Sequence, residues 1–251
     1  MFRSLLPTGL LVACLLAGSA GTRAEKPVHL FILSGQSNMQ GLDPGNGFLP
    51  EARRLLPDGE VVHLKVAKGG QPIRFWVAEW DALAKAAGLR QTNPQGPVFY
   101  DAILNGLQPI LAKHPSPASI SFCWMQGERD AKSGMETAYA AALRQLIANL
   151  RRDLKRPDLN VVIGRISDHD PGAKLRAGWE AVRKIHVQVA HDDPHGAWVD
   201  TDDANNKTKN GRPNDDLHYT KDGYKLFGQR LARQAVRLIR GEKPADDGRP
   251  K

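Results

Sequence analysis

The sequence predicts a three-layer α/β/α sandwich with a central parallel sheet of about five strands. Five short apolar runs are spaced along the chain, and amphipathic helical patterns lie between most of them. A strand that alternates with a helix predicts crossover connections, which place helices on both faces of a parallel sheet.

The elements follow in chain order. The run VHLFIL at residues 28–33 is continuously apolar, as expected of a parallel strand buried on both faces. The predicted strands are residues 28–33, 61–67, 119–125, 160–166 and 196–200, and the predicted helices are residues 98–113, 136–153, 173–190 and 221–240. The polar tail 241–251, which contains Pro and Gly, is predicted to be disordered.

Residues 1–24 have the pattern of a signal peptide, with a basic start, an apolar centre and small residues at the end. We expect cleavage after Ala24, with Ala20 as the alternative, and hence a periplasmic or secreted protein. The apolar segment is too short for a stable membrane span. Lipidation at Cys14 is disfavoured because six mostly apolar residues follow that cysteine.

The expected mature chain of about 225 residues fits one domain, residues 25–240. Removal of Arg3 and Arg23 would lower the formal charge from +8 to +6. The remaining basic residues are scattered, so we expect no nucleic-acid partner, and nothing in the composition sets the oligomeric state. Cys123 would be the only cysteine left, which excludes an internal disulfide.

Ser37 follows the first predicted strand in a small-residue turn, FILSGQSNMQG, between Gln36 and Asn38. A serine at such a position commonly caps the next helix. It can instead be a nucleophile, provided that a base takes its proton. Ligands of parallel sheets bind at the carboxyl ends of the strands, where this turn, KGGQ, QGERD and the segment 201–219 are all expected to lie.

The segment NDDLHYT at residues 214–220 supplies a histidine, His218, with Asp215 three residues before it. In a serine hydrolase the acid orients the imidazole, which deprotonates the serine. The alternative is a surface turn whose Asp215 caps the helix that begins near Thr220. Candidate oxyanion donors are the Ser37 N–H, the Gly69-Gly70 turn and the Gln126 side chain. The alternatives are a plain tight turn for Gly69-Gly70 and a hydrogen-bonded structural amide for Gln126.

Four segments together resemble the blocks of a known family: G-Q-S-N-M-x-G at residues 35–41, A-x-G-G-x-x-I-x-x-W at 67–76, W-x-Q-G-E-x-D-A at 124–131 and D-x-x-H-Y at 215–219. Their order and spacing resemble the SGNH hydrolase superfamily, and within it the sialate O-acetylesterase-like and acetylxylan-esterase-like carbohydrate esterases. The resemblance covers residues 27–240 and implies a flavodoxin-like fold.

The resemblance also implies roles for individual residues. It makes Ser37 the nucleophile, with Asp215 and His218 as acid and base, and it completes the oxyanion hole with Gly70 and Gln126; Gly69 is the alternative to Gly70. No metal or organic cofactor is implied. Relatives commonly have a serine where this chain has Arg129, a difference that concerns local charge and substrate preference.

We therefore expect a secreted serine esterase that removes acetyl or similarly short acyl groups from a carbohydrate through an acyl-enzyme. Gln36, Asn38 and Trp76 are candidate substrate contacts, although Trp76 could equally pack in the core, and Glu128 is expected to brace its loop. The alternatives are a short-chain lipid or thioester hydrolase on the same fold and a carbohydrate-binding protein without activity.

Overall fold

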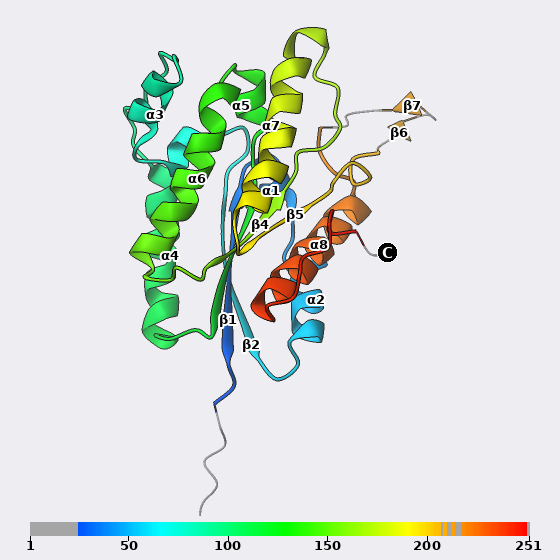
Figure 1. The fold of residues 1–251 in the computed structure, drawn as a ribbon. Helices are drawn as coiled ribbons and strands as arrows, with labels where there is room; N and C mark the ends of the chain where they lie inside the picture. The colour runs from blue at the N-terminus through cyan, green and yellow to red at the C-terminus, as the bar shows by residue number, and fades with distance from the viewer. Residues whose placement is uncertain (1–24, 207, 210–211, 214–216, 250–251) are drawn as a thin grey trace, which may run out of the picture.

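A computed structural model of the protein describes residues 25–206 and 217–249 in full and the backbone of residues 208–209 and 212–213. It has a five-stranded parallel sheet between two layers of helices (Figure 1), which confirms the predicted fold class. The predicted signal peptide, residues 1–24, and the predicted catalytic acid Asp215 lie outside the described residues.

The sheet has the order β2-β1-β3-β4-β5. Its strands are β1 (Val28–Gly35), β2 (Glu60–Ala67), β3 (Ser119–Met125), β4 (Asn160–Gly164) and β5 (Gly196–Val199). The mostly apolar β1, β3 and β4 are buried almost throughout, whereas the edge strands β2 and β5 keep partly exposed positions. The chain runs from β1 to β2 on one side and then to β3 on the other, so the carboxyl end of β1 is a topological switch point.

Helices cover both faces of this sheet (Figure 1). One face carries α4 (Val98–Lys113), α6 (Glu136–Asp153) and α7 (Ala173–Asp192), with α3 (Trp80–Ala86) beside α6, and the other carries α2 (Phe48–Leu55) and α8 (Lys221–Ile239). The four predicted long helices are confirmed. Their ends differ from the expected ones by two residues or fewer.

The short elements were not predicted. They are α1 (Ser37–Gly41), α2, α3, α5 (Glu128–Lys132), the 3-10 helix η1 (Ile73–Trp76), and an antiparallel pair, β6 (Thr208–Lys209) and β7 (Arg212–Pro213). Helices of one or two turns contain too few residues to establish a hydrophobic period. Three of these elements, α1, α5 and η1, follow the carboxyl ends of β1, β3 and β2.

The prediction of a disordered tail is wrong for residues 241–249. Ala245 exchanges backbone hydrogen bonds of 2.7 and 3.0 Å with the Gln234 side chain on α8, and the carbonyl of Asp247 accepts from the Asp200 N–H at 2.8 Å. Arg249 forms an ion pair with Asp200 at 3.0 Å. These polar partners compensate for the small apolar content of the tail.

Within the described residues, no helix combines the length and the hydropathy that a membrane span requires. Cys123 lies buried in the centre of β3 as a free thiol, and burial raises its pKa well above the usual range.

Candidate active site

The turn after β1 presents Ser37 at the switch point of the sheet. Gly35 has φ +146°, and a Cβ there would lie 1.9 Å from the carbonyl oxygen of Met125, so only glycine fits. The Gln36 N–H then donates to that oxygen at 2.8 Å. Ser37 is the first residue of α1, whose N-cap is Gln36, and no side chain caps this helix. The capping interpretation of Ser37 therefore does not apply.

Ser37 and His218 line the same cavity, although 181 positions separate them in the sequence. The cavity has a volume of about 410 Å³ and lies at the carboxyl end of the sheet. It is lined by Gln36, Ser37, Gly69, Gly70, Glu128, Arg129, Lys132, Leu217 and His218. All four loops that were expected at this edge contribute to the lining or lead into it.

The segment that carries His218 is fixed on both sides of the histidine. The Leu217 carbonyl accepts from the Asn38 side chain at 3.0 Å, and the Thr220 N–H donates to the Ala204 carbonyl at 2.9 Å. Thr220 also caps α8, because its hydroxyl accepts from the Gly223 N–H at 2.8 Å. The cap of α8 is thus a residue other than Asp215.

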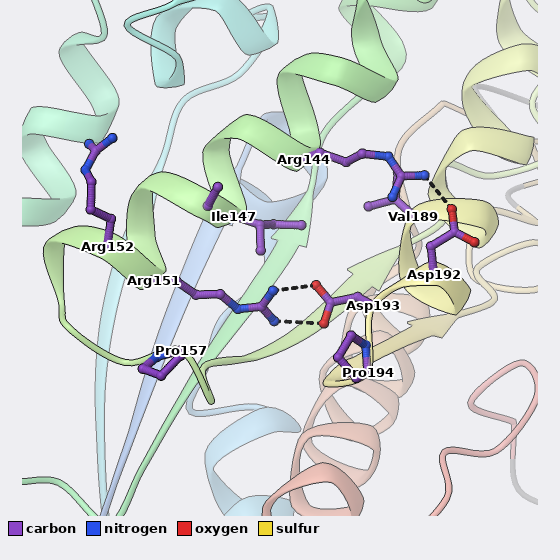
Figure 2. A pocket seen from close by; sticks show the side chains of 10 residues that line it. Arg144, Ile147, Arg151, Arg152, Pro157, Val189, Asp192, Asp193 and Pro194 are labelled. Atoms are coloured by element: carbon purple, nitrogen blue, oxygen red, sulfur yellow. Dashed lines mark hydrogen bonds and ion pairs between the residues drawn. The ribbon is translucent and has the colours of Figure 1, made fainter.

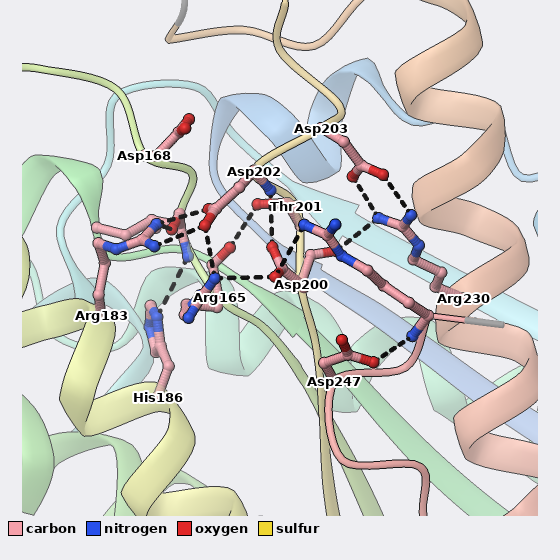
Figure 3. A network of polar contacts seen from close by, with 12 residues as sticks. Arg165, Asp168, Arg183, His186, Asp200, Thr201, Asp202, Asp203, Arg230 and Asp247 are labelled. Carbon is pink, nitrogen blue, oxygen red and sulfur yellow. Dashed lines mark hydrogen bonds and ion pairs between the residues drawn. The ribbon is translucent and has the colours of Figure 1, made fainter. Parts of the chain in front are cut away.

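A network of aspartates and arginines anchors the residues that lead into this segment (Figure 3). Asp202 accepts from Arg183 at 2.8 Å and from Arg165 at 2.7 Å, and Asp203 accepts two hydrogen bonds of 2.6 Å from Arg230. Arg165 directly follows β4, and Arg183 and Arg230 belong to α7 and α8. Residues 200–204 are therefore held to three separate elements, which fixes the Ala204 carbonyl that receives the Thr220 N–H.

Asn38 connects the Ser37 turn to two other loops. Its side chain is fully buried and donates to Glu128 Oε1 at 2.9 Å as well as to the Leu217 carbonyl, and it accepts from the Tyr224 hydroxyl at 3.2 Å. With these partners it has no face left for a substrate. Its place indicates a structural role in holding Ser37, Glu128 and the His218 segment together.

Trp76 is also fully buried. Its indole N–H donates to Ser34 Oγ at 2.9 Å, and its ring meets that of Trp124 edge to face at a centroid distance of 5.3 Å. This placement fits the core-packing alternative and does not support a sugar contact. Gln36, by contrast, does line the cavity, while its Oε1 accepts from the Arg129 N–H at 3.2 Å.

The glycine turn after β2 lies against the serine, since a Cβ on Gly69 would be 3.6 Å from Ser37 Cβ. The Gly69 N–H already donates to Gln40 Oε1 at 2.6 Å. Gly70 has φ +69°, and its N–H has no hydrogen-bond partner among the described residues. Of the two glycines, Gly70 is therefore the candidate oxyanion donor. The Ser37 N–H is the second candidate, because a first helical residue has no intrahelical acceptor.

The side chain of Gln126 does not lie where an oxyanion donor would have to lie. It is fully buried and absent from the cavity lining, and its amide nitrogen donates to the Gln71 carbonyl at 3.1 Å, to Gln36 Oε1 at 3.2 Å and to Asp130. An amide has only two N–H bonds, and these three acceptors use them. The arrangement supports the structural-amide alternative for Gln126.

At the cavity and in the core around it, burial changes the ionisation of three groups. It raises the pKa of Glu128 to about 7 and that of Asp130 to about 6, and it lowers the pKa of His186 to about 3. Asp130 accepts from the Ile73 N–H at 3.0 Å, which ties α5 to the 3-10 helix after the glycine turn. The carboxylate of Glu128 accepts from the amide of Asn38, which fits the expected role of bracing its loop.

Four contributors to the site were not assigned from the sequence: Gln40, Lys132, Leu217 and the contact of Arg129 with Gly70. Gln40 lies one turn after Ser37 on α1, so its spacing was a usable signal. Lys132 Nζ lies 5.4 Å from the centroid of the Trp179 ring and adds a second cation to the cavity beside Arg129.

A larger cavity, of about 570 Å³, lies between α6 and α7 (Figure 2). Two of its arginines are paired, Arg151 with Asp193 at 2.8 Å and Arg144 with Asp192 at 2.6 Å. Pro157 and Pro194 place it near the starts of β4 and β5, at the edge of the sheet opposite Ser37. Neither a serine nor a histidine is among its lining residues, so it does not provide a serine–histidine pair.

In the part of the chain that the structure describes, no three His, Cys, Asp or Glu side chains are grouped closely enough to hold a metal ion.

Comparison with known families identifies the family of the chain. A sequence profile described as "Carbohydrate esterase, sialic acid-specific acetylesterase" matches residues 40–237, which is most of the chain. The protein belongs to this family. It is a carboxylic ester hydrolase of the carbohydrate acetylesterase type, and the suspected relationship is confirmed.

Solved structures share the fold. A protein from Arabidopsis thaliana has a TM-score of 0.60 at 19% identity, over 84% of this chain and 98% of its own. A carbohydrate acetylesterase from Xanthomonas citri has a TM-score of 0.56 at 17% identity, over 86% of this chain and 57% of its own. NanS has a TM-score of 0.55 at 13% identity, over 86% of this chain and 98% of its own. At such identities the likeness establishes the fold alone. A search of curated proteins found no match.

Proposed function

We propose that the protein is a periplasmic or secreted serine esterase that removes acetyl groups from a carbohydrate through a covalent acyl-enzyme. The observation that carries the proposal is the shared cavity of Ser37 and His218, with the Gly70 N–H beside them. The periplasmic or secreted location comes from the signal-like pattern of residues 1–24.

In the first half-reaction Ser37 Oγ attacks the acetyl carbonyl while His218 accepts the serine proton. The tetrahedral oxyanion receives hydrogen bonds from the N–H groups of Ser37 and Gly70. The carbon–oxygen bond to the sugar then breaks, and His218 returns the proton to the sugar oxygen. Asp215 is the proposed partner that orients the imidazole.

In the second half-reaction a water molecule attacks the acetyl-enzyme while His218 takes one of its protons. Collapse of the second tetrahedral intermediate releases acetate and restores the Ser37 hydroxyl. No group outside the chain is required for either proton transfer.

The lining of the cavity favours a short acyl group. Leu217 is the only aliphatic side chain larger than alanine among its described lining residues, and the other side chains are polar, charged or absent. Each buried methylene stabilises an acyl chain by about 0.8 kcal/mol only where an apolar wall receives it. Among the described lining residues, Leu217 alone gives this cavity a branched aliphatic side chain, so we expect a longer acyl tail to gain little.

The test is a series of nitrophenyl esters from acetate to octanoate, followed by acetylated oligosaccharides. We expect kcat/KM to be highest for acetate and to fall with chain length, and we expect release of acetate from the oligosaccharides. A steady rise toward octanoate would favour a lipid hydrolase, and absence of all turnover would favour a binding protein. Ser37→Ala should be inactive, whereas the exposed Ser116→Ala serves as a matched control.

A further inference from the structure

The Gly69-Gly70 turn is held from two sides by side chains outside the predicted triad. On one side the Gly69 N–H donates to Gln40 Oε1 at 2.6 Å. On the other, Arg129 Nε donates to the Gly70 carbonyl at 2.8 Å. Gln40 belongs to α1 and Arg129 to α5, so the turn is tied both to the helix of the nucleophile and to the loop after β3.

These two contacts fix the two peptides that flank the Gly69–Gly70 peptide. The peptide between Gly69 and Gly70 carries the candidate oxyanion N–H. The preceding peptide is held through the Gly69 N–H, and the following peptide is held through the Gly70 carbonyl. Two successive glycines would otherwise be free to rotate, because glycine has the widest range of backbone conformations.

Both side chains have anchors of their own. The Gln40 carbonyl accepts from Lys65 Nζ at 2.8 Å, which holds the end of α1 against β2. Arg129 follows Glu128, whose carboxylate is bound to Asn38, and the Arg129 N–H donates to Gln36 Oε1. Each contact with the turn therefore starts from a residue whose backbone is already in place.

We propose that Gln40 and Arg129 are positioning residues, which hold the Gly70 N–H toward the oxyanion of the tetrahedral intermediate. This role rests on the proposed esterase function and adds to it. Preorganised donors stabilise a transition state because they need no reorientation when charge develops. Arg129 was expected to affect substrate preference, and its guanidinium also holds the Gly70 carbonyl.

The expected signature is a loss of kcat with little change in KM, since the oxyanion exists only in the transition state. Displacement of a reacting or stabilising group by about 1 Å can cost about a hundredfold in rate. We expect Gln40→Met and Arg129→Met each to lower kcat by about tenfold to a hundredfold, with KM within about threefold of the wild type.

Both side chains are exposed, so the thermal unfolding temperature should stay close to that of the wild type. Gln40→Glu keeps an acceptor oxygen for the Gly69 N–H and should retain most of the activity. Arg90→Met and Gln91→Met, at exposed positions far along the chain from the turn, are the matched controls and should behave as the wild type.

Two further readouts separate this proposal from the esterase assignment. A boronate that forms a tetrahedral adduct with serine should bind Gln40→Met and Arg129→Met more weakly, in proportion to the loss of kcat. Hydrogen–deuterium exchange of the peptide that contains residues 68–71 should be faster in both variants, and this readout needs no turnover.

The positioning role is overturned if Ser37→Ala is inactive while Gln40→Met and Arg129→Met keep kcat within twofold of the wild type, or if exchange at residues 68–71 is unchanged. A rise in KM alone would instead assign Arg129 to substrate binding. If Ser37→Ala retains full activity, the esterase mechanism itself is wrong, and exchange at the turn still decides whether the two side chains order it.

Discussion

Replacement of Glu128 by glutamine should make the protein less sensitive to alkaline pH. Burial raises the pKa of this carboxyl from 4.5 to about 7. Between these two values the folded chain keeps a proton that the unfolded chain has released, so the free energy of unfolding of the wild type falls as the pH rises. Above pH 7 the accumulated loss from this one group is about 3 kcal/mol.

Glu128→Gln has no proton to lose and keeps the Oε1 that accepts from Asn38. The free energy of unfolding of the variant minus that of the wild type should therefore increase by about 2 to 3 kcal/mol from pH 5 to pH 8. The lowered pKa of His186 acts in the opposite direction, since it stabilises the fold as the pH rises from about 3 toward 6.5, but it is common to both proteins and cancels in the difference.

The assay is urea unfolding, followed by tryptophan fluorescence, at four pH values from 5 to 8. The matched control is Glu180→Gln on α7, where the side chain is 52% exposed, and its difference from the wild type should not change with pH. Parallel curves of Glu128→Gln and the wild type over this range would show that burial does not raise the pKa of this carboxyl.

Three further predictions follow from the site. Asn38→Ala should lower kcat at least tenfold and lower the free energy of unfolding by about 2 kcal/mol, because it leaves the Leu217 carbonyl and Glu128 without their donor. Urea unfolding measures the stability and a turnover assay measures kcat; a loss of stability with an unchanged kcat would show that Asn38 does not position the site. Activity on a nitrophenyl acetate should fall as the medium becomes acidic, because a protonated His218 cannot accept the serine proton, and a flat rate profile from pH 5 to pH 8 would count against the triad. Dialysis against EDTA should leave the rate unchanged, whereas activity restored only by an added divalent metal would show that the chemistry depends on one.

The long elements were predictable because each has a hydrophobic pattern of its own. Strand β3 is mostly apolar and is buried over its whole length, and α4 and α6 begin and end where their patterns do. The rule that ligands lie at the carboxyl ends of parallel strands also placed Ser37 and the glycine turn correctly at one edge. The order of the strands then makes the end of β1 the topological switch point of that edge.

The remaining parts depend on contacts between distant side chains, which no local pattern records. The block around Gln126 indicated a donor to substrate, but the side chain turns inward because Gln36 and Asp130 offer it acceptors. Trp76 could have faced a sugar, and the hydroxyl of Ser34 decides that it faces the core. The tail looked disordered because its partners, among them Gln234, lie on other elements.

The nucleophilic role of Ser37 is tested most directly by trapping the acyl-enzyme. The protein is mixed with a nitrophenyl acetate, quenched in acid during steady-state turnover, digested and mapped by mass spectrometry. We expect one acetyl group on the peptide that contains Ser37, formed no more slowly than turnover, and neither the acetyl group nor turnover in Ser37→Ala. Turnover by Ser37→Ala at the wild-type rate, or an acetyl group that appears on another residue at the rate of turnover, would contradict this role.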